Sequence, residues 1–201
     1  MKISTTPIHR DINCDPLTWD LHLDTGYTQQ QVYSELTSLD WSTAHQCVMP
    51  NRLEMRQQPT SPCLFSIQDY LHSPEIKNSV LDLLYKNQIY SYWSIDPDDM
   101  ARITVTGGVF VKDLPGFSCP RHVDTRSLIC TGMLMFGPDD VPEQRTFFYR
   151  TDKDTEKYWE SNSQFEHGWL NATLHNTWHE GYNNSDVDRY AYLFHISLKI
   201  F

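Results

Sequence analysis

Residues Lys112–Arg126 read KDLPGFSCPRHVDTR, and this segment contains the first two candidate functional residues. Pro115 and Gly116 mark a tight turn. His122 and Asp124 follow it, two positions apart, and we expect them at the start of a strand. Residues i and i+2 of a strand point to the same face. The imidazole and the carboxylate therefore converge on one point, as two ligands of a metal ion must.

The stretch Asn176–Phe194, NTWHEGYNNSDVDRYAYLF, supplies a third ligand and a cation. His179 lies in a strand-like segment, and two histidines with one carboxylate on a β scaffold form the facial triad of non-heme Fe(II) sites. The polar turn Tyr182–Asp188 predicts that the strands of His179 and Arg189 form a hairpin. Arg189 then faces the same cavity, where its guanidinium can bind a carboxylate through two parallel hydrogen bonds.

The order of elements along the chain is helices first and then a run of short strands. Thr28–Leu39 and Ser73–Lys86 have the apolar spacing and the capping residues of helices. A short strand is expected near Asn51–Arg56, in an otherwise irregular stretch. After Tyr90 the chain is rich in β-branched and aromatic residues, which predicts antiparallel strands over 101–112, 126–136, 144–150, 168–180 and 189–201. This order predicts a mainly β (α+β) protein, a sandwich or barrel backed by N-terminal helices.

Length and composition restrict the class of protein. The chain of 201 residues is long enough for a single domain, 1–201, with helical support and edge strands over 1–95 and the β core over 96–201. A net charge of −10 argues against a nucleic-acid partner, which requires a basic surface. Apolar runs are too short for a membrane span. Five cysteines without a CxxC pair and the lack of a secretion signal predict reduced thiols and a cytoplasmic location.

Several residues compete for roles at this site. The pattern His-x-Asp (HxD), which His122 and Asp124 form, has little information by itself, because His9–Asp11 and His22–Asp24 have the same pattern. His175 is an alternative to His179 as the third ligand, and it more readily packs or hydrogen-bonds near the site. We expect His195 to be an interior histidine with its hydrogen bonds satisfied. Arg126 either meets substrate or pairs with a surface acid.

The order of strand, Pro-Gly turn, HxD, strands, His, Arg and final strand resembles one family. Lys112–Arg126 and Asn176–Phe194 are similar to the Pro-Gly…His-x-Asp segment and the closing His…Arg segment of Fe(II)/2-oxoglutarate dioxygenases of the prolyl 4-hydroxylase-like type. The resemblance covers about residues 100–200 and implies a double-stranded β-helix, or jelly roll. It implies that His122, Asp124 and His179 hold Fe(II) and that Arg189 binds the C5 carboxylate of the co-substrate 2-oxoglutarate.

Two positions depart from the family pattern. Many relatives have a tyrosine just before the Pro-Gly turn that helps to bind 2-oxoglutarate, and here Asp113 and Leu114 precede it. Many others have a serine two residues after the arginine, and here Ala191 stands there. The second contact to the co-substrate is therefore open, and the candidates on facing strands are Tyr149, Thr131 and Ser127.

The resemblance implies an oxygenase, most simply a hydroxylase of an amino acid, a prolyl residue or another small substrate. Such an enzyme uses O2 and a small-molecule or peptidyl substrate, and converts 2-oxoglutarate to succinate and CO2. Because Asp124 is present, halogenation is disfavoured. Two alternatives stay open at this point. One is a cupin-like metalloprotein that does not depend on 2-oxoglutarate, and the other is a non-catalytic jelly-roll binding module. The oligomeric state is not indicated by the sequence.

Overall fold

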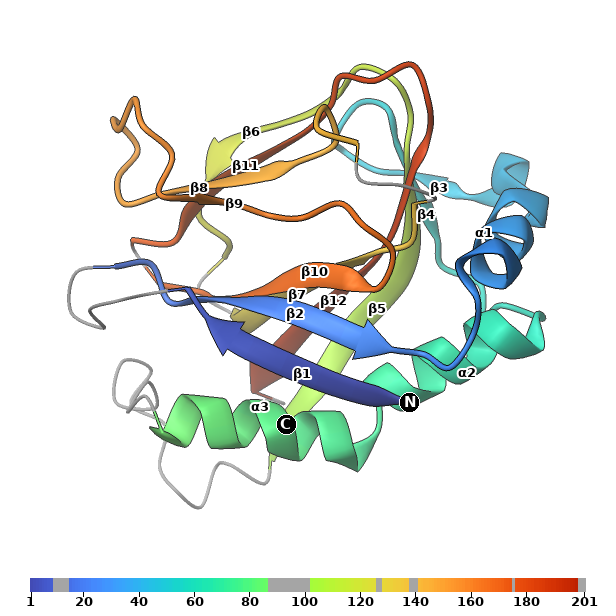
Figure 1. Ribbon diagram of the computed structural model, residues 1–201, viewed down its shortest axis with the longest axis horizontal. Coiled ribbons are helices and arrows are strands. Elements are labelled where there is room, and N and C mark those ends of the chain that lie inside the picture. Colours follow the sequence, from blue (N-terminus) through green and yellow to red (C-terminus); the bar gives the residue numbers. More distant parts are fainter. Residues whose placement is uncertain (9–14, 87–101, 126–127, 138–140, 175, 199–201) are drawn as a thin grey trace.

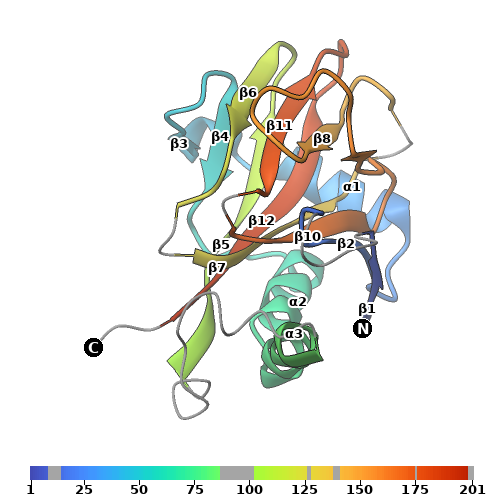
Figure 2. The same cartoon turned by 90° about the vertical axis from the view of Figure 1, so that its left-hand side faces the viewer.

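The computed structural model describes residues 1–8, 15–86, 102–125, 128–137, 141–174 and 176–198. These residues form two antiparallel β-sheets that face each other, and helices cover the far side of the larger sheet (Figure 1). Turning the molecule shows the two sheets as the walls of a flattened barrel (Figure 2).

The strands follow a jelly-roll order. The larger sheet has the order β1-β2-β10-β7-β12-β5-β4-β3, and the smaller sheet has the order β6-β11-β8-β9. In the larger sheet the bounds are β1 (Lys2–Pro7), β2 (Thr18–Asp24), β3 (His45–Gln46), β4 (Arg52–Met55), β5 (Ile103–Asp113), β7 (Leu128–Met135), β10 (His167–Ala172) and β12 (Arg189–Leu198). In the smaller sheet they are β6 (Phe117–His122), β8 (Thr146–Tyr149), β9 (Trp159–Glu160) and β11 (Trp178–Asn183). From β5 to β12 the chain passes back and forth between the sheets, which confirms the predicted double-stranded β-helix.

The N-terminal segments extend the larger sheet at both edges. Strand β2 lies beside β10 with β1 at the outer edge, and β4 lies beside β5 with β3 at the other edge. The expected strand near Asn51–Arg56 is therefore present as β4. The expected division between residues 95 and 96 lies outside the described residues. No helix in the described part of the chain is long and apolar enough to cross a membrane.

Three expectations about strand arrangement are wrong. The HxD triplet does not begin a strand, since His122 is the last residue of β6 and Asp124 lies beyond it. The chain between 168 and 180 is two strands, because it leaves the larger sheet after β10 and enters the smaller one at β11. For the same reason β11 and β12 do not pair as a hairpin. They belong to facing sheets, and the turn between them crosses from one to the other.

The helices form the layer behind the larger sheet. Helix α1 (Gln29–Ser38) has Thr28 as its cap, with a full capping box, and α3 (Pro74–Lys86) begins with its proline, so both predictions are confirmed. Helix α2 (Pro62–Leu71) was not expected. Its signals are present in the sequence, because Ser61 caps it and Pro62 opens it. A short 3₁₀ turn, η1, covers Trp41–Thr43.

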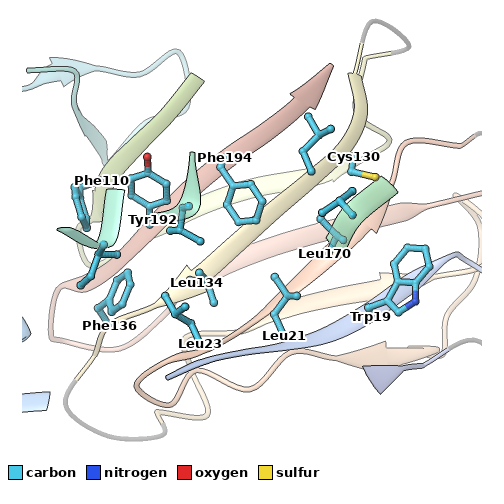
Figure 3. Packing of buried hydrophobic residues seen from close by; sticks show 14 of the residues in the cluster. Trp19, Leu21, Leu23, Phe110, Cys130, Leu134, Phe136, Leu170, Tyr192 and Phe194 are labelled. Atoms are coloured by element: carbon cyan, nitrogen blue, oxygen red, sulfur yellow. The ribbon is translucent and has the colours of Figure 1, made fainter. Parts of the chain in front are cut away.

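The main hydrophobic core lies between the larger sheet and the helices. Figure 3 shows its side chains projecting from β2, β5, β7, β10 and β12 toward the same side. At Gly132 the ring of Phe194 takes the space of a side chain, since a Cβ there would lie 2.3 Å from the ring. A second, smaller cluster lies between the sheets, around Met133, Phe148 and Trp169. Because this inner cluster is small, the space between the sheets has room for polar groups.

Candidate metal centre

The smaller sheet brings two histidines face to face. His122 ends β6 and His179 lies near the start of β11, and the two residues are register partners in this antiparallel pair. Asp124 follows the end of β6, and its Oδ1 lies 3.6 Å from Nε2 of His122 and 3.9 Å from Nε2 of His179. One ligand atom from each of the three residues lies within 4.8 Å of the others. The structure therefore gathers the three predicted ligands at one point.

Backbone carbonyls set the orientation of both imidazole rings. Nδ1 of His122 donates to the carbonyl of Pro120 at 2.8 Å, and Nδ1 of His179 donates to that of Thr177 at 3.1 Å. A carbonyl only accepts, so each ring has a proton on Nδ1, and Nε2 is the nitrogen that faces the cluster. Metal-binding histidines are commonly oriented in this way by a hydrogen bond from the other ring nitrogen.

The carboxylate of Asp124 has an unused buried oxygen. Its Oδ2 makes no hydrogen bond with any described residue, although it is shielded from solvent. Burial opposes the charged form, but the contact with His122 and the nearby His179 outweigh it and hold the pKa of Asp124 below its usual value. A buried, ionised oxygen without a donor needs a cation. Two imidazole nitrogens and this oxygen fit a divalent metal of the first transition row.

His179 lies in an apolar pocket. Its ring stacks on Phe148, with 5.7 Å between centroids, and lies 5.6 Å from Trp169. Burial lowers the pKa of His179, although Asp124 works against this. The pKa of His122 is instead raised, chiefly by its hydrogen bond to Asp124. The half-exposed side of the centre is therefore at His122, and the dry side is at His179.

The three candidate ligands open onto a cavity of about 190 Å³ between the sheets. Arg189 lines the same cavity, as the sequence predicted for a residue that meets the co-substrate. Thr131 of β7 also lines it. The remaining walls come from β4, β6, β7, β8, β10, β11 and β12 and from the turn at Cys47–Met49. One face of this jelly roll thus combines a candidate metal centre with a cationic group.

Arg189 is already paired inside the protein. Its Nε and Nη2 donate to Oδ2 of Asp113, at 2.9 and 2.5 Å, and its Nη1 donates to the carbonyl of Tyr182. The other oxygen of Asp113 accepts from Nε of Arg52 at 2.5 Å. Asp113 is fully buried, and the guanidinium of Arg52 lies 4.3 Å above the ring of Phe117. Arg189 was predicted from the sequence, but no sequence pattern indicated that Arg52 would lie beside it.

Tyr149 does not line the cavity. Along β8, Phe148 points inward, so Tyr149 points to the outer face of the smaller sheet. There its hydroxyl donates to Glu180, and the guanidinium of Arg121 lies 3.3 Å from its ring centroid. Burial and the Glu180 carboxylate raise the pKa of Tyr149 to about 12. Tyr149 therefore links Glu180 and Arg121 on the outer face of the smaller sheet.

The other sequence candidates divide into two groups. Thr131 lies close to His195, with 3.4 Å between Oγ1 and Nδ1, and both line the cavity. Burial lowers the pKa of His195, which favours the neutral, interior ring that the sequence predicts. Ser127, Arg126 and the alternative ligand His175 lie outside the described residues.

Comparisons with known proteins identify the fold. No family model and no curated protein matches the sequence. Among solved structures, a prolyl-4-hydroxylase from Pseudomonas putida has a TM-score of 0.56 at 10% identity, over 98% of this chain and 93% of its own. The fold is that of the 2OG-Fe(II) oxygenases.

Two further structures of this fold contain ligands. A prolyl hydroxylase from Trichoplax adhaerens, in complex with a peptide fragment of the hypoxia inducible factor oxygen degradation domain, has a TM-score of 0.54 at 15% identity, over 85% of this chain and 78% of its own. HygX from Streptomyces hygroscopicus, with nickel, 2-oxoglutarate and hygromycin B bound, has a TM-score of 0.59 at 11% identity, over 90% and 84%. The likeness to these oxygenases confirms the resemblance at the level of the fold.

Proposed function

We propose that this chain is an Fe(II)- and 2-oxoglutarate-dependent oxygenase, most simply a hydroxylase. The observation that carries the proposal is the convergence of His122, Asp124 and His179, with the unpartnered Oδ2 of Asp124, in a cavity that also contains Arg189. Two imidazoles and one carboxylate leave coordination positions free for other ligands. The structures with the same fold include proteins solved with 2-oxoglutarate, which supports the choice of co-substrate.

The residues of the chain divide the work among them. His122, Asp124 and His179 would hold the metal, which supplies the redox chemistry with O2 when it is bound. The carbonyls of Pro120 and Thr177 keep both rings in the binding tautomer. Around His179, Phe148 and Trp169 exclude water from one side of the centre. The arginines in the cavity attract and orient an anionic co-substrate.

The substrate that we propose is an amino acid, a prolyl residue in a peptide, or another small molecule. The proteins of the same fold include prolyl hydroxylases and a protein solved with hygromycin B, so the fold accepts both peptides and small molecules. A cavity of about 190 Å³ has the size for a small molecule or one side chain beside the co-substrate. A cytoplasmic location stays a prediction.

The decisive experiment is an anaerobic titration. Fe(II) is added to the metal-free protein, then 2-oxoglutarate, while the visible absorption band of an Fe(II)-bound 2-oxo acid is followed. We expect the band to saturate at one equivalent per chain, and admission of O2 to release succinate. Asp124→Ala should show neither signal. His45→Ala, which removes an exposed histidine of β3, should behave like the wild type.

The alternatives give different results in the same experiment. A protein that binds Fe(II) but gives no band with 2-oxoglutarate is a metalloprotein independent of this co-substrate. A protein that binds neither is a non-catalytic module of this fold. Either result would overturn the proposal.

A further inference from the structure

Three charged residues lie in a row across the larger sheet. Arg52 of β4 and Arg189 of β12 are both register partners of Asp113, the last residue of β5. Arg52 bonds to both carboxylate oxygens, at 2.5 and 2.8 Å, and Arg189 bonds to Oδ2 through two nitrogens. All three are buried, with exposures of 8%, 0% and 2% in the order Arg52, Asp113, Arg189. This row is built into the sheet, because its three residues are register partners on neighbouring strands.

The row has one positive charge in excess. Burial acts to raise the pKa of Asp113, but the two guanidinium groups outweigh it and hold that pKa below its usual value, so the carboxylate is ionised. Arginine stays protonated in proteins. Among the described residues, no other carboxylate forms an ion pair with Arg52 or Arg189. Since an unmatched buried charge is costly, the row is suited to receive one anionic group from the cavity that both arginines line.

The free hydrogen-bond donors of the row belong mainly to Arg52. A guanidinium has five N–H donors. Asp113 and the carbonyl of Tyr182 take three of those on Arg189. Only two of those on Arg52 are used, both by Asp113, and its Nη1 has no partner among the described residues. The ring of Phe117, 4.3 Å from the guanidinium carbon, holds the plane of Arg52 in place.

We propose that Arg52 binds the distal carboxylate of the 2-oxo acid co-substrate, and that Asp113 is a positioning residue that occupies Arg189 and aligns Arg52. This inference rests on the proposed function and changes the residue that recognises the co-substrate. Arg189 contributes its charge and anchors Asp113. The internal carboxylate of Asp113 thus takes the position on Arg189 that the sequence assigned to the co-substrate.

The test compares two co-substrates that differ only at the distal group. 2-Oxopentanoate has the carbon chain of 2-oxoglutarate with a methyl group in place of the distal carboxylate. Affinities of both are measured by calorimetry on the anaerobic Mn(II) protein, for the wild type, Arg52→Ala, Arg52→Lys and Arg189→Ala. Arg56→Ala is the control, because Arg56 is exposed and, within the described part of the chain, forms an ion pair with Glu54 alone.

We expect the wild type to bind 2-oxoglutarate more tightly than 2-oxopentanoate. In Arg52→Ala this preference should fall about ten- to a hundred-fold, which corresponds to the free energy of a hydrogen bond to a charged group. The affinity of Arg52→Ala for 2-oxopentanoate and for Mn(II) should be unchanged, which a merely structural role of Arg52 would not allow. Arg52→Lys should recover part of the preference. Added guanidinium ion should restore part of it to Arg52→Ala.

The outcomes separate this inference from the proposed function. A wild type that binds neither 2-oxo acid would overturn both. A wild type that prefers 2-oxoglutarate, with an Arg52→Ala that keeps the full preference, would overturn the inference alone. If Arg189→Ala then abolishes the preference, Arg189 binds the carboxylate directly.

Discussion

Asp124 is the residue on which the metal centre depends most. It is the only anionic member of the three candidate ligands, and its Oδ2 is buried without a donor. A bound metal ion would give this unused oxygen a partner.

Alanine substitution of each candidate ligand should abolish stable metal binding. Loss of a group that merely orients a ligand costs about 10–100-fold in affinity, and loss of a ligand should cost at least as much. The measurement is Mn(II) affinity of His122→Ala, Asp124→Ala and His179→Ala, with His45→Ala as the control. If His179→Ala binds Mn(II) normally and His175→Ala does not, His175 is the ligand.

Asp113 should be among the most sensitive residues for stability. Removing the shared partner leaves two buried guanidinium groups without a counter-charge, and breaking such a buried pair costs about 3–5 kcal/mol. We expect Asp113→Ala to lower the free energy of unfolding in urea by this amount at pH 7. The half-exposed pair of Asp188 and Lys112, at 2.7 Å, is the control, and Asp188→Ala should cost under about 1 kcal/mol.

The ionisation of Asp113 makes the free energy of unfolding depend on pH. The folded-state pKa of Asp113 lies below its ordinary value of 3.8. Its charged form therefore stabilises the fold at pH values above that ordinary value, and the contribution is lost as the pH falls through the folded-state pKa. The difference in unfolding free energy between the wild type and Asp113→Asn should shrink on acidification below about pH 4. A difference that stays constant to pH 3 would contradict this.

At the level of elements, the close approach of β10 and β7 depends on a glycine. A Cβ at Gly168 would lie 1.9 Å from the carbonyl oxygen of Met133, so one strand would have to move. We expect Gly168→Ala to lower the free energy of unfolding by about 1–3 kcal/mol or more. Gly181 of β11 is the control, because its Cβ would meet nothing closer than 3.7 Å. Equal unfolding midpoints for Gly168→Ala and Gly181→Ala would show that β10 can shift without cost.

Local sequence patterns predict some elements correctly and others not. Thr28 and Pro74 have local roles as cap and first helical residue, so α1 and α3 could be predicted from neighbouring residues. The stretch 168–180 could not be divided correctly, since nothing in the local sequences of β10 (HGWLNA) and β11 (WHEGYN) shows which sheet each strand joins. Which sheet a strand joins depends on partners far away in the sequence.

For the molecule as a whole, ligands that bind only the folded state should raise its stability. Mn(II) at a hundred times its dissociation constant should contribute about 2.7 kcal/mol to the free energy of unfolding. 2-Oxoglutarate should raise the melting temperature further, and only when the metal is present. Differential scanning calorimetry measures both steps. Asp124→Ala should show neither, and an increase with 2-oxoglutarate alone would contradict a metal-dependent site.

Sequence patterns alone predicted the fold class and the three candidate metal ligands. The reason is that HxD, the later histidine and the arginine have a characteristic order along a chain of short strands. This order can be read from the sequence without knowing which residues are in contact. Only the tertiary structure decided the partners of Arg189. Arg52 and Asp113 are far apart in the sequence, and they meet because β4, β5 and β12 lie side by side. Tyr149 was misplaced for the same reason, since the face on which a strand residue lies depends on its register with neighbouring strands.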